Sequence, residues 1–391
     1  MLSIGIFTYS TKPRGSVVHA ACLAEALQRK GAQVTLYALS KAGDAFFRPL
    51  SCQLRLFPAA PAPTDVDALI RQRIAEFRAG LDTLRPRHDI CHAEDCLAAN
   101  ALDAAKSELR GAAVVRTVHH VEHFESPYLM DCQQRSVSCA DLVLSVSQVT
   151  SREVRAAFGR DAPVISNGVD LQRFTACPAS DQQRMREQLA VERGDTVILS
   201  VGGIESRKNS LAALRAVALA FTRQPRLRWV IAGGASIWEH EAYRSEFARQ
   251  LAQLPAELQA RITILGTVAE ADLTALYRMS DVLLCPSLQE GFGLCVLEAL
   301  ASRCAVIVPR GAPFDEYLDP CCATFVDPGS ATQIAASLVR LLSDPSERHR
   351  SAREGYQRVQ LYSWDLVAER HLARYESLPR RDAPALPQPQ Y

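Results

Sequence analysis

The sequence has few lysines and almost no net charge. Of its 391 residues, 44 are lysine or arginine and 43 are aspartate or glutamate, so the formal net charge is +1. This balance creates no field that would gather nucleic acid, and no nucleic-acid partner is expected. Lysine occurs only at positions 12, 30, 41, 106 and 208, so arginine supplies nearly all of the positive charge.

Long apolar runs and cysteines at the spacing of a metal site are also missing. No window approaches about eighteen uninterrupted apolar residues, the length that predicts a membrane-spanning helix. The start, MLSIGIFTYSTKPRG, has no charged region ahead of its apolar run and predicts a strand, not a signal peptide. The twelve cysteines are scattered without a C-x-x-C motif, and most have apolar neighbours, as reduced core thiols do. We therefore expect a cytoplasmic protein.

Short apolar runs alternate with helix-length periodic segments along most of the chain. The runs are rich in β-branched residues and apolar throughout, which is typical of strands covered on both faces. Such alternation predicts α/β architecture with parallel sheets. Amphipathic helices are predicted at 17–31 and 69–87. The predicted strands cover residues 2–8, 33–39, 89–94, 112–118, 141–147 and 162–166, followed by 196–202, 227–233, 261–266, 281–286 and 304–309.

A polar stretch without strands, at about residues 170–195, divides the pattern in two. The chain length also suits two domains, which are predicted at 1–170 and 190–360. The proline-rich end, 378–391, predicts a disordered tail. In doubly wound sheets, ligands bind beyond the carboxyl ends of the strands, so we expect the functional residues in the strand-end loops.

Two loops of the first half contain candidate residues. Gly15 and Ser16 open a helix whose unpaired N–H groups can hold an anion, although an ordinary strand-to-helix turn explains them equally well. His119 directly follows a strand and is a candidate polar group of the site, with a structural histidine as the alternative. His119 and His123 have a metal-ligand spacing, but H-E-x-x-H is absent and Pro127 favours a loop. No metal site is expected there.

Lys208 is the only lysine of the second half of the sequence. It precedes a predicted helix and has Arg207 beside it. Where arginine is the default cation, a lysine indicates a site that needs a compact charge for phosphate. An exposed cation at a helix start is an equally good explanation.

The segment SLQEGFGLCVLEALAS, residues 287–302, places Glu290 and Glu298 eight residues apart with two glycines behind the first. Glycine lets the backbone approach a ligand, and the start of the following helix offers N–H groups to phosphate. Carboxylates at either end can accept hydrogen bonds from vicinal hydroxyls, as in dinucleotide-binding folds. The order of hydroxyl, phosphate and hydroxyl partners matches a nucleotide-sugar.

With these motifs the chain resembles the large retaining glycosyltransferase family 4, of the glycosyltransferase group 1 type. The resemblance rests on NGVDLQRF (167–174), VGGIESRKN (201–209), the block at 265–301 and PFDEYL (313–318). It implies a GT-B fold, in which two Rossmann-like, doubly wound parallel-sheet domains face a central cleft. The segment 361–377 is similar to the family's last helix, which crosses back to the first domain.

The resemblance also implies roles for individual residues. Glu298 would hold the donor ribose, Lys208 would neutralise the leaving diphosphate, and His119 would face the reacting centre. The donor sugar and diphosphate would be held by Glu290 and the backbone of Gly291, Phe292, Gly293 and Leu294. Gly15 and Ser16 would lie near the diphosphate and acceptor, and the backbone of Val268 would meet the base.

The chain departs from the family pattern at two positions. The family usually has an arginine where Gly203 stands, and that arginine clamps the diphosphate. We predict that Arg207 partly replaces it. Ser16 takes the place of a second glycine that many members have in the first loop.

The implied activity is transfer of a sugar, with retention, from a UDP- or GDP-linked donor to an acceptor hydroxyl on a small molecule, a glycan or a lipid-linked molecule. No metal or other cofactor is expected. A nucleotide-sugar epimerase or phosphorylase on the same fold is an alternative, and so is a non-catalytic sugar-nucleotide sensor. If the acceptor is lipid-linked, the arginine-rich helix at 69–87 could contact an anionic membrane, although such helices more often pack on their own sheet.

Overall fold

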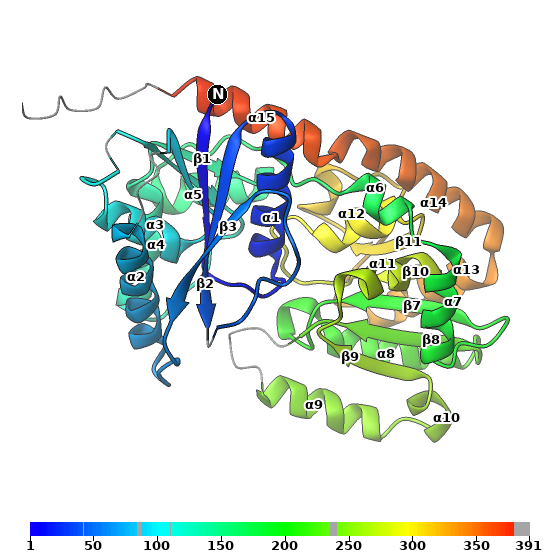
Figure 1. Cartoon of the computed structure of the whole chain (residues 1–391). Coiled ribbons are helices and arrows are strands. Elements are labelled where there is room, and N and C mark those ends of the chain that lie inside the picture. The colour runs from blue at the N-terminus through cyan, green and yellow to red at the C-terminus, as the bar shows by residue number, and fades with distance from the viewer. Residues whose placement is uncertain (42, 84–87, 110, 235–240, 379–391) are drawn as a thin grey trace, which may run out of the picture. The chain divides into compact units, whose positions relative to one another are not determined.

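The computed structural model describes residues 1–41, 43–83, 88–109, 111–234 and 241–378 (Figure 1). The chain forms two compact units, one of residues 1–168 together with 364–391 and the other of residues 169–363. Each unit contains a six-stranded parallel sheet flanked by helices. The predicted fold class, two Rossmann-like domains with parallel sheets, is confirmed. Within the described residues, no helix combines the length and the apolar composition needed to span a bilayer.

The sheet of the first unit has the strand order β3-β2-β1-β4-β5-β6. Helices connect most of its successive strands and cover both faces, whereas β2 and β3 are joined without a helix in the described residues. The strands are β1 (Ser3–Thr8), β2 (Gln33–Lys41), β3 (Gln53–Ala59), β4 (Ile90–Ala93), β5 (Ala113–Val118) and β6 (Leu142–Ser145). The helices are α1 (Gly15–Arg29), α2 (Val66–Asp82), α3 (Cys96–Ala104), α4 (Pro127–Ser138), α5 (Gln148–Phe158) and α15 (Trp364–Glu376).

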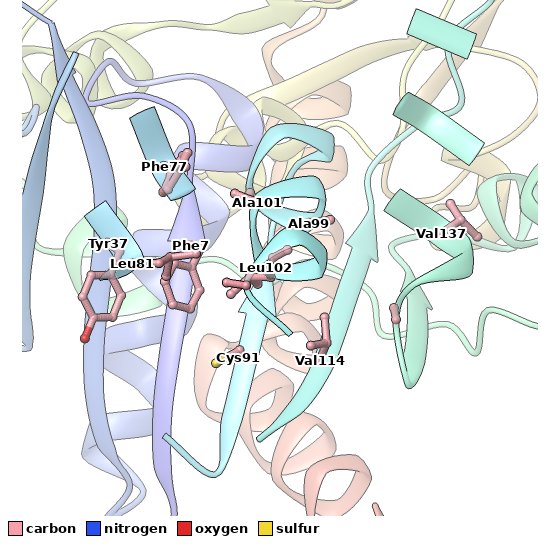
Figure 2. Packing of buried hydrophobic residues seen from close by; sticks show 14 of the residues in the cluster. Phe7, Tyr37, Phe77, Leu81, Cys91, Ala99, Ala101, Leu102, Val114 and Val137 are labelled. Carbon is pink, nitrogen blue, oxygen red and sulfur yellow. The ribbon is translucent and has the colours of Figure 1, made fainter. Parts of the chain in front are cut away.

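The core of this unit lies between its sheet and the helices α2, α3 and α4 (Figure 2). Phe7 of β1 stacks on Tyr37 of β2 with ring centroids 4.7 Å apart, and Phe77 of α2 is fully buried close by. Strands β1, β4 and β5 have buried side chains along almost their whole length. This burial on both faces is why their sequences are apolar runs and do not alternate.

Helix α15 comes from the far end of the chain and packs with α1. Arg29 pairs with Asp365, whose Oδ1 lies 2.7 Å from Nη2, and Lys30 pairs with Glu369 at 2.6 Å. One face of α15 is buried, through Trp364, Val367, Ala368, His371 and Tyr375. These exposed ion pairs contribute little by themselves, so the apolar face supplies most of the attachment.

The sheet of the second unit has the strand order β12-β11-β10-β7-β8-β9. Its strands are β7 (Thr196–Val201), β8 (Leu227–Ala232), β9 (Ile262–Gly266), β10 (Val282–Leu284), β11 (Ala305–Pro309) and β12 (Thr324–Val326). The helices are α6 (Leu171–Thr175), α7 (Ala179–Gln188), α8 (Ser210–Phe221), α9 (Glu241–Ala252), α10 (Ala256–Gln259), α11 (Glu270–Met279), α12 (Leu294–Ala301), α13 (Ala331–Ser343) and α14 (Pro345–Val359). Short 3₁₀ turns occur at Ser206–Lys208, Phe314–Glu316 and Gln360–Tyr362.

The structure differs from the sequence-based prediction in a few elements. Strands β3 and β12 were not predicted, and the predicted strand at 162–166 is a single bridge between Val164 and Ser145. Strand β3 lies at the sheet edge and has a half-polar sequence containing Pro58, so it lacks the apolar signature of the inner strands. Helix α2 ends at Asp82, and residues 84–87 of the predicted helix lie outside the described residues, as does the predicted tail beyond Leu378.

Candidate functional site

Lys208 and Glu290 form an ion pair in the second unit. Lys208 ends the 3₁₀ turn that follows β7, and Glu290 lies in the loop between β10 and α12. The Nζ of Lys208 donates to Oε1 of Glu290, and Ser287 Oγ donates to the same oxygen at 3.0 Å. Because β7 and β10 are neighbouring parallel strands, their carboxyl ends bring these two loops together.

The pair is largely shielded from water. The side chains of Lys208 and Glu290 are 15% and 10% exposed. Burial disfavours charge on both groups, yet the Glu290 carboxylate raises the pKa of Lys208 and Lys208 in turn lowers the pKa of Glu290. Both groups are therefore charged at neutral pH. An ammonium has three N–H donors, so Lys208 can keep Glu290 as a partner and still donate to an anion.

Arg207 is the next cation beside this pair. Its Nε lies 3.0 Å from Oε2 of Glu205, its Nη1 lies 3.9 Å from Oε2 of Glu290, and its side chain is 47% exposed. Position 203 leaves no space for an arginine in this backbone conformation, because a Cβ there would lie 2.6 Å from the carbonyl oxygen of Gly234. The geometry is consistent with the predicted substitution of Arg207 for the missing arginine, which stays a prediction.

The loop that follows Glu290 is held by aromatic packing. Phe292 is buried and stacks on Tyr317 with ring centroids 4.6 Å apart, and the Tyr317 hydroxyl donates to the Phe292 carbonyl at 3.0 Å. Gly293 has φ +93°, and a Cβ there would meet the Phe314 ring at 2.8 Å, so this position requires glycine. Phe292 thus anchors the loop by its ring, while Gly291 and Leu294 are partly exposed on either side.

Helix α12 begins directly after this loop. Among the described residues no side chain caps its N-terminus, and its first turn contains no acidic residue. The Val296 N–H donates to the Gly293 carbonyl at 2.9 Å, and the start of the helix with the positive end of its dipole can still attract an anion near Lys208. This arrangement agrees with the expectation that the helix start after residues 287–293 can bind a phosphate.

Glu298 lies farther along α12 and has a partner of its own. Its Oε2 accepts a hydrogen bond at 2.7 Å from the hydroxyl of Tyr277, which is fully buried in α11. Burial raises the pKa of Glu298. The structure therefore brings Arg207, Lys208 and Glu290 together. Glu298 lies on helix α12, after the loop that contains Glu290, and is hydrogen-bonded to Tyr277. Sequence reasoning missed Tyr277, because a tyrosine inside an amphipathic helix gives no signal of its partner.

Val268 belongs to another strand-end loop of this sheet. The backbones of three neighbouring strand ends pack together here, since Gly233 donates to the Gly266 carbonyl at 2.7 Å and Gly202 donates to the Ala232 carbonyl at 2.8 Å. Val268 follows β9 and is partly buried. Because both residues follow strands of the same parallel sheet, Val268 and Lys208 lie at the same edge of that sheet. The contacts described for Lys208 and Glu290 do not include Val268.

In the first unit, His119 shares a buried carboxylate with a second histidine. His119 follows β5, Glu94 follows β4, and His19 lies in α1. The Oε2 of Glu94 lies 2.9 Å from Nε2 of His119 and 3.0 Å from Nδ1 of His19. The side chains of Glu94 and His19 are fully buried, and His119 is 13% exposed. The sequence reasoning missed Glu94 and His19, although Glu94 stands at a strand end and could have been found by the rule that selected His119.

The charges of this group follow from its burial. Burial lowers the pKa of His119 to about 4, so the ring is neutral at pH 7. Burial works against ionisation of Glu94 too, but the neighbouring His19, His92 and His119 hold its pKa well below the ordinary value. An ionised carboxylate only accepts hydrogen bonds, so Nε2 of His119 donates to Glu94 and Nδ1 remains an acceptor.

The same three side chains are also the ones that could hold a metal ion. One nitrogen or oxygen from each of His19, Glu94 and His119 lies within 4.8 Å of the other two. Two imidazoles and a carboxylate are a common ligand set for zinc. The 2.9 Å separation between His119 and Glu94 is a hydrogen bond, whereas His19 Nδ1 lies 3.0 Å from the same oxygen without hydrogen-bond geometry.

Helix α15 extends this polar group. The hydroxyl of Tyr375 lies 2.5 Å from Nδ1 of His92, and Nε2 of His92 lies 2.7 Å from Oγ1 of Thr117. The Trp364 ring meets His19 edge-on with centroids 5.2 Å apart. Helix α15 therefore packs on His19 and His92, and its own His371 lies beside both rings. We call His19, His92, Glu94, His119 and His371 the buried network.

Gly15 and Ser16 form the start of α1, four and three residues before His19. Gly15 is exposed, with open space where a Cβ would point. In the described chain no side chain caps this helix, and its first turn has no acidic residue. Both features are those expected of an anion-binding turn, and they fit an ordinary exposed helix start equally well.

The arginines of α2 are engaged within the first unit. Arg73 is buried and donates to Glu76 at 2.6 Å, Arg78 pairs with Glu108 at 2.9 Å, and the Arg71 guanidinium lies 3.5 Å from the centroid of Tyr128. These contacts favour a helix that packs on its own domain over one that binds a membrane. Arg85 and Arg87 lie outside the described residues.

Replacing Glu94 with glutamine tests the shared carboxylate. Glutamine removes the negative charge and turns one carboxylate oxygen into a buried NH2 donor without an acceptor, so the free energy of unfolding should fall by about 1–3 kcal/mol. Urea denaturation measures the change. Glu122→Gln is the matched control, because Glu122 meets His120 at the surface and such pairs contribute about 0–1 kcal/mol. Equal effects of the two substitutions would contradict the role given to Glu94.

Two protein-family models match the chain. The model of glycosyltransferase family 4 matches residues 13–173, and that of glycosyl transferases group 1 matches residues 181–358. Together they extend over both units. The chain belongs to this glycosyltransferase family.

Curated relatives agree with this assignment. The chain is 29% identical over 246 residues to a D-inositol 3-phosphate glycosyltransferase of Corynebacterium glutamicum, a match that covers 61% of this chain and 57% of the relative. It is 30% identical over 261 residues to a protein of the same name from Kineococcus radiotolerans, covering 62% and 58%. The matched region thus spans less than two thirds of the length of these relatives.

Solved structures share the fold along the whole chain. Anabaena HepE, solved with UDP and glucose, superposes with a TM-score of 0.79 at 21% identity, covering 97% of this chain and 100% of that one. WaaG, a glycosyltransferase of lipopolysaccharide biosynthesis, gives a TM-score of 0.71 at 14% identity, covering 96% and 100%. These likenesses establish the GT-B fold.

Proposed function

We propose that the protein transfers a sugar from a UDP- or GDP-linked donor to an acceptor hydroxyl, with retention of anomeric configuration and without a metal ion. The observation that supports this most directly is the shielded Lys208–Glu290 pair, with Arg207 beside it and the uncapped start of α12 directly after it. The relatives named for inositol phosphate glycosylation and the HepE complex with UDP and glucose support a nucleotide-sugar donor.

In the second unit, cations and a helix start would bind the diphosphate. Negative charge grows on this group as the bond to the sugar breaks, and donors that are already in place stabilise it without reorganisation. Lys208 would donate to the leaving phosphate while it keeps Glu290 as a partner. Arg207 is half-exposed and would turn from Glu205 to the diphosphate. It would take the role of the arginine that the family usually has at position 203, where this chain has glycine.

The carboxylates of the second unit would bind the hydroxyls of the donor. Glu290 would accept from hydroxyls of the sugar, and the backbone of Gly291–Leu294 would lie along the sugar and diphosphate. Glu298, oriented by Tyr277, would accept from the ribose. The backbone near Val268 would meet the base.

In the first unit, His119 would contribute the polar group of the reacting centre. Glu94 fixes the orientation of its ring and the position of its proton, which leaves Nδ1 to accept a hydrogen bond. The turn at Gly15 and Ser16 would supply N–H groups to a phosphate or to the acceptor.

A donor screen followed by a turnover assay tests the activity. UDP-, GDP- and ADP-sugars are screened by thermal shift, and the donor that stabilises the protein is incubated with and without hydroxyl acceptors, including inositol phosphate and lipid-linked acceptors. We expect free nucleotide to appear with acceptor and the product to keep the donor's anomeric configuration, as read from proton NMR couplings. Binding without nucleotide release would identify a sensor instead, and an inverted product would refute retention.

Chelation tests the absence of a metal. His19, Glu94 and His119 are the residues that could hold one, so the protein is dialysed against EDTA and assayed with the same donor and acceptor. We expect an unchanged rate, because the positive charge that the diphosphate needs comes from Lys208, Arg207 and α12. A loss of activity that zinc or magnesium restores would contradict this part of the proposal.

A further inference from the structure

Two thiols lie against each other next to the Lys208–Glu290 pair. Cys285 directly follows β10, and Cys295 is in the first turn of α12. Their sulfur atoms are 4.0 Å apart, and both side chains are free thiols in the protein interior. The loop with Ser287, Glu290 and Gly293 connects the two cysteines along the chain, so a bond between the sulfurs would close this loop into a ring.

Cys285 is connected to the ion pair through one hydroxyl. Its sulfur lies 3.5 Å from Oγ of Ser287, which donates to Glu290. A cavity of about 20 Å³ is lined by Cys285, Ser287, Lys208 and Gly202. Since a cavity of about 10–15 Å³ holds a water molecule, this space is large enough for a small molecule beside Cys285, although the residue is only 5% exposed.

The surroundings favour the thiolate of one partner. A hydrogen bond from Cys295 lowers the pKa of Cys285, and the nearby Lys208 lowers it further. The same hydrogen bond raises the pKa of Cys295 well above its ordinary value. The thiolate is the nucleophile in cysteine oxidation, so Cys285 is the sulfur that reacts first and Cys295 the one that follows.

We propose that Cys285 and Cys295 form a reversible disulfide under peroxide, and that this bond switches off the site around Lys208 and Glu290. Cys285 releases its proton, and its thiolate attacks one oxygen of the peroxide. The O–O bond breaks, Cys285 becomes a sulfenic acid, and the departing hydroxide takes up the released proton as water. Cys295 then loses its proton and attacks this sulfur, so that the S–S bond forms and the hydroxide that leaves takes up the proton as water. One peroxide is reduced to two waters, and two thiols are oxidised to one disulfide. Dithiothreitol reverses the bond by thiol–disulfide exchange.

Closing the bond is expected to move the loop. The sulfurs have to approach from 4.0 Å to about 2.05 Å, which pulls the end of β10 toward the first turn of α12. The hydrogen bonds from Ser287 and Lys208 to Glu290 depend on the position of this loop. A displacement of about 1 Å at a catalytic site can cost about 10²-fold in rate, and we expect a loss of this size in nucleotide release. The effect on rate rests on the proposed function, whereas disulfide formation does not.

Peptide mapping of the full-length protein tests the site. Wild type, Cys285→Ser and Cys295→Ser are treated with hydrogen peroxide, quenched, digested without reductant and analysed by mass spectrometry, with thermal melting as the check of folding. Cys304→Ser is the matched control, because Cys304 is equally buried but its sulfur contacts a backbone carbonyl. We expect a peptide pair joined through Cys285 and Cys295 in wild type and Cys304→Ser, its absence in the other two, and its disappearance with dithiothreitol.

Two further measurements follow the consequence of the bond. Hydrogen exchange of the peptide covering 286–294 should change on oxidation of wild type and stay constant in Cys295→Ser. Nucleotide release should fall about 10²-fold in wild type and Cys304→Ser, the two proteins that form the bond, and return on reduction. Oxidation of Cys285 to sulfinic acid without a cross-link, or a cross-link that leaves both exchange and turnover unchanged, would overturn the proposal. A cross-link with altered exchange in a protein that uses no nucleotide-sugar would refute the proposed activity and keep the redox site.

Discussion

Replacing Lys208 with alanine is expected to lower nucleotide release by about 10²–10³-fold, the usual loss when one preorganised charge or donor is removed from a transition state. Lys208 is held in place by Glu290, so in the proposed reaction its charge would need no reorganisation when the diphosphate departs. Binding of the donor should weaken far less than turnover, since the charge on the leaving group increases as the bond breaks. Steady-state rates with the donor found by thermal shift measure both quantities.

The same substitution leaves the Glu290 carboxylate shielded from water without its main partner, and such a loss can itself destabilise a protein by about 3–5 kcal/mol. Lys208→Ala with Glu290→Gln removes the unpaired charge, so comparing the thermal melting of the single and double variants shows how much of the effect of Lys208→Ala is on folding. Lys106→Ala is the matched control, because Lys106 is an exposed lysine of the first unit whose Nζ contacts only a carbonyl, at 3.5 Å. Near-normal turnover of a folded Lys208→Ala protein would refute the role of Lys208.

Mild acid is expected to unfold the first unit selectively. Burial lowers the pKa of His92 and His119 to about 4 and that of His371 to about 3, against about 6.5 in an unfolded chain. Below pH 6.5 the histidines become protonated in the unfolded chain, whereas the buried rings stay neutral. The free energy of unfolding therefore decreases as the pH falls from about 6.5 toward 4. Each ring that stays neutral contributes a slope of up to about 1.4 kcal/mol per pH unit.

Glu94 acts in the same direction at lower pH. Its pKa is lowered in the fold, so the stability that it contributes above the ordinary carboxyl range is lost as the pH falls through its folded pKa. Urea titrations between pH 7 and 5, followed by hydrogen exchange of β4 and β5, measure the slope. His371→Asn should reduce the slope, and His349→Gln, which changes an exposed histidine, should not. A free energy of unfolding that stays constant over this pH range would contradict the neutral state of the network.

The sequence predicted the fold class and the placement of Lys208 and Glu290 in strand-end loops for one physical reason. Parallel strands covered on both faces must be apolar throughout, so they are visible in a sequence, and their carboxyl ends lie at one edge of a sheet. Lys208 and Glu290 follow the adjacent strands β7 and β10, and their contact follows from this rule. Edge strand β3 was not predicted, because about half of its side chains face water and its sequence is not apolar throughout.

The partners of the site residues could not be predicted in the same way. Tyr277 meets Glu298 across two packed helices, and Tyr375 meets His92 from a helix almost three hundred positions later in the chain. Periodicity reports which face of a helix is buried but not which residue it meets. The crowding at Gly203 is likewise a property of the neighbouring backbone of Gly234, which the sequence does not display.

The position of α15 also sets the order in which the protein can mature on the ribosome. Residues 1–168 are made first, but the helix that covers their buried histidines is made only after the 195 residues from 169 to 363. At about 5–20 residues per second, that is a delay of roughly 10 to 40 s. During this interval the second unit can complete its fold, whereas the first unit lacks the helix that packs on His19 and His92 until residues 364–376 are made.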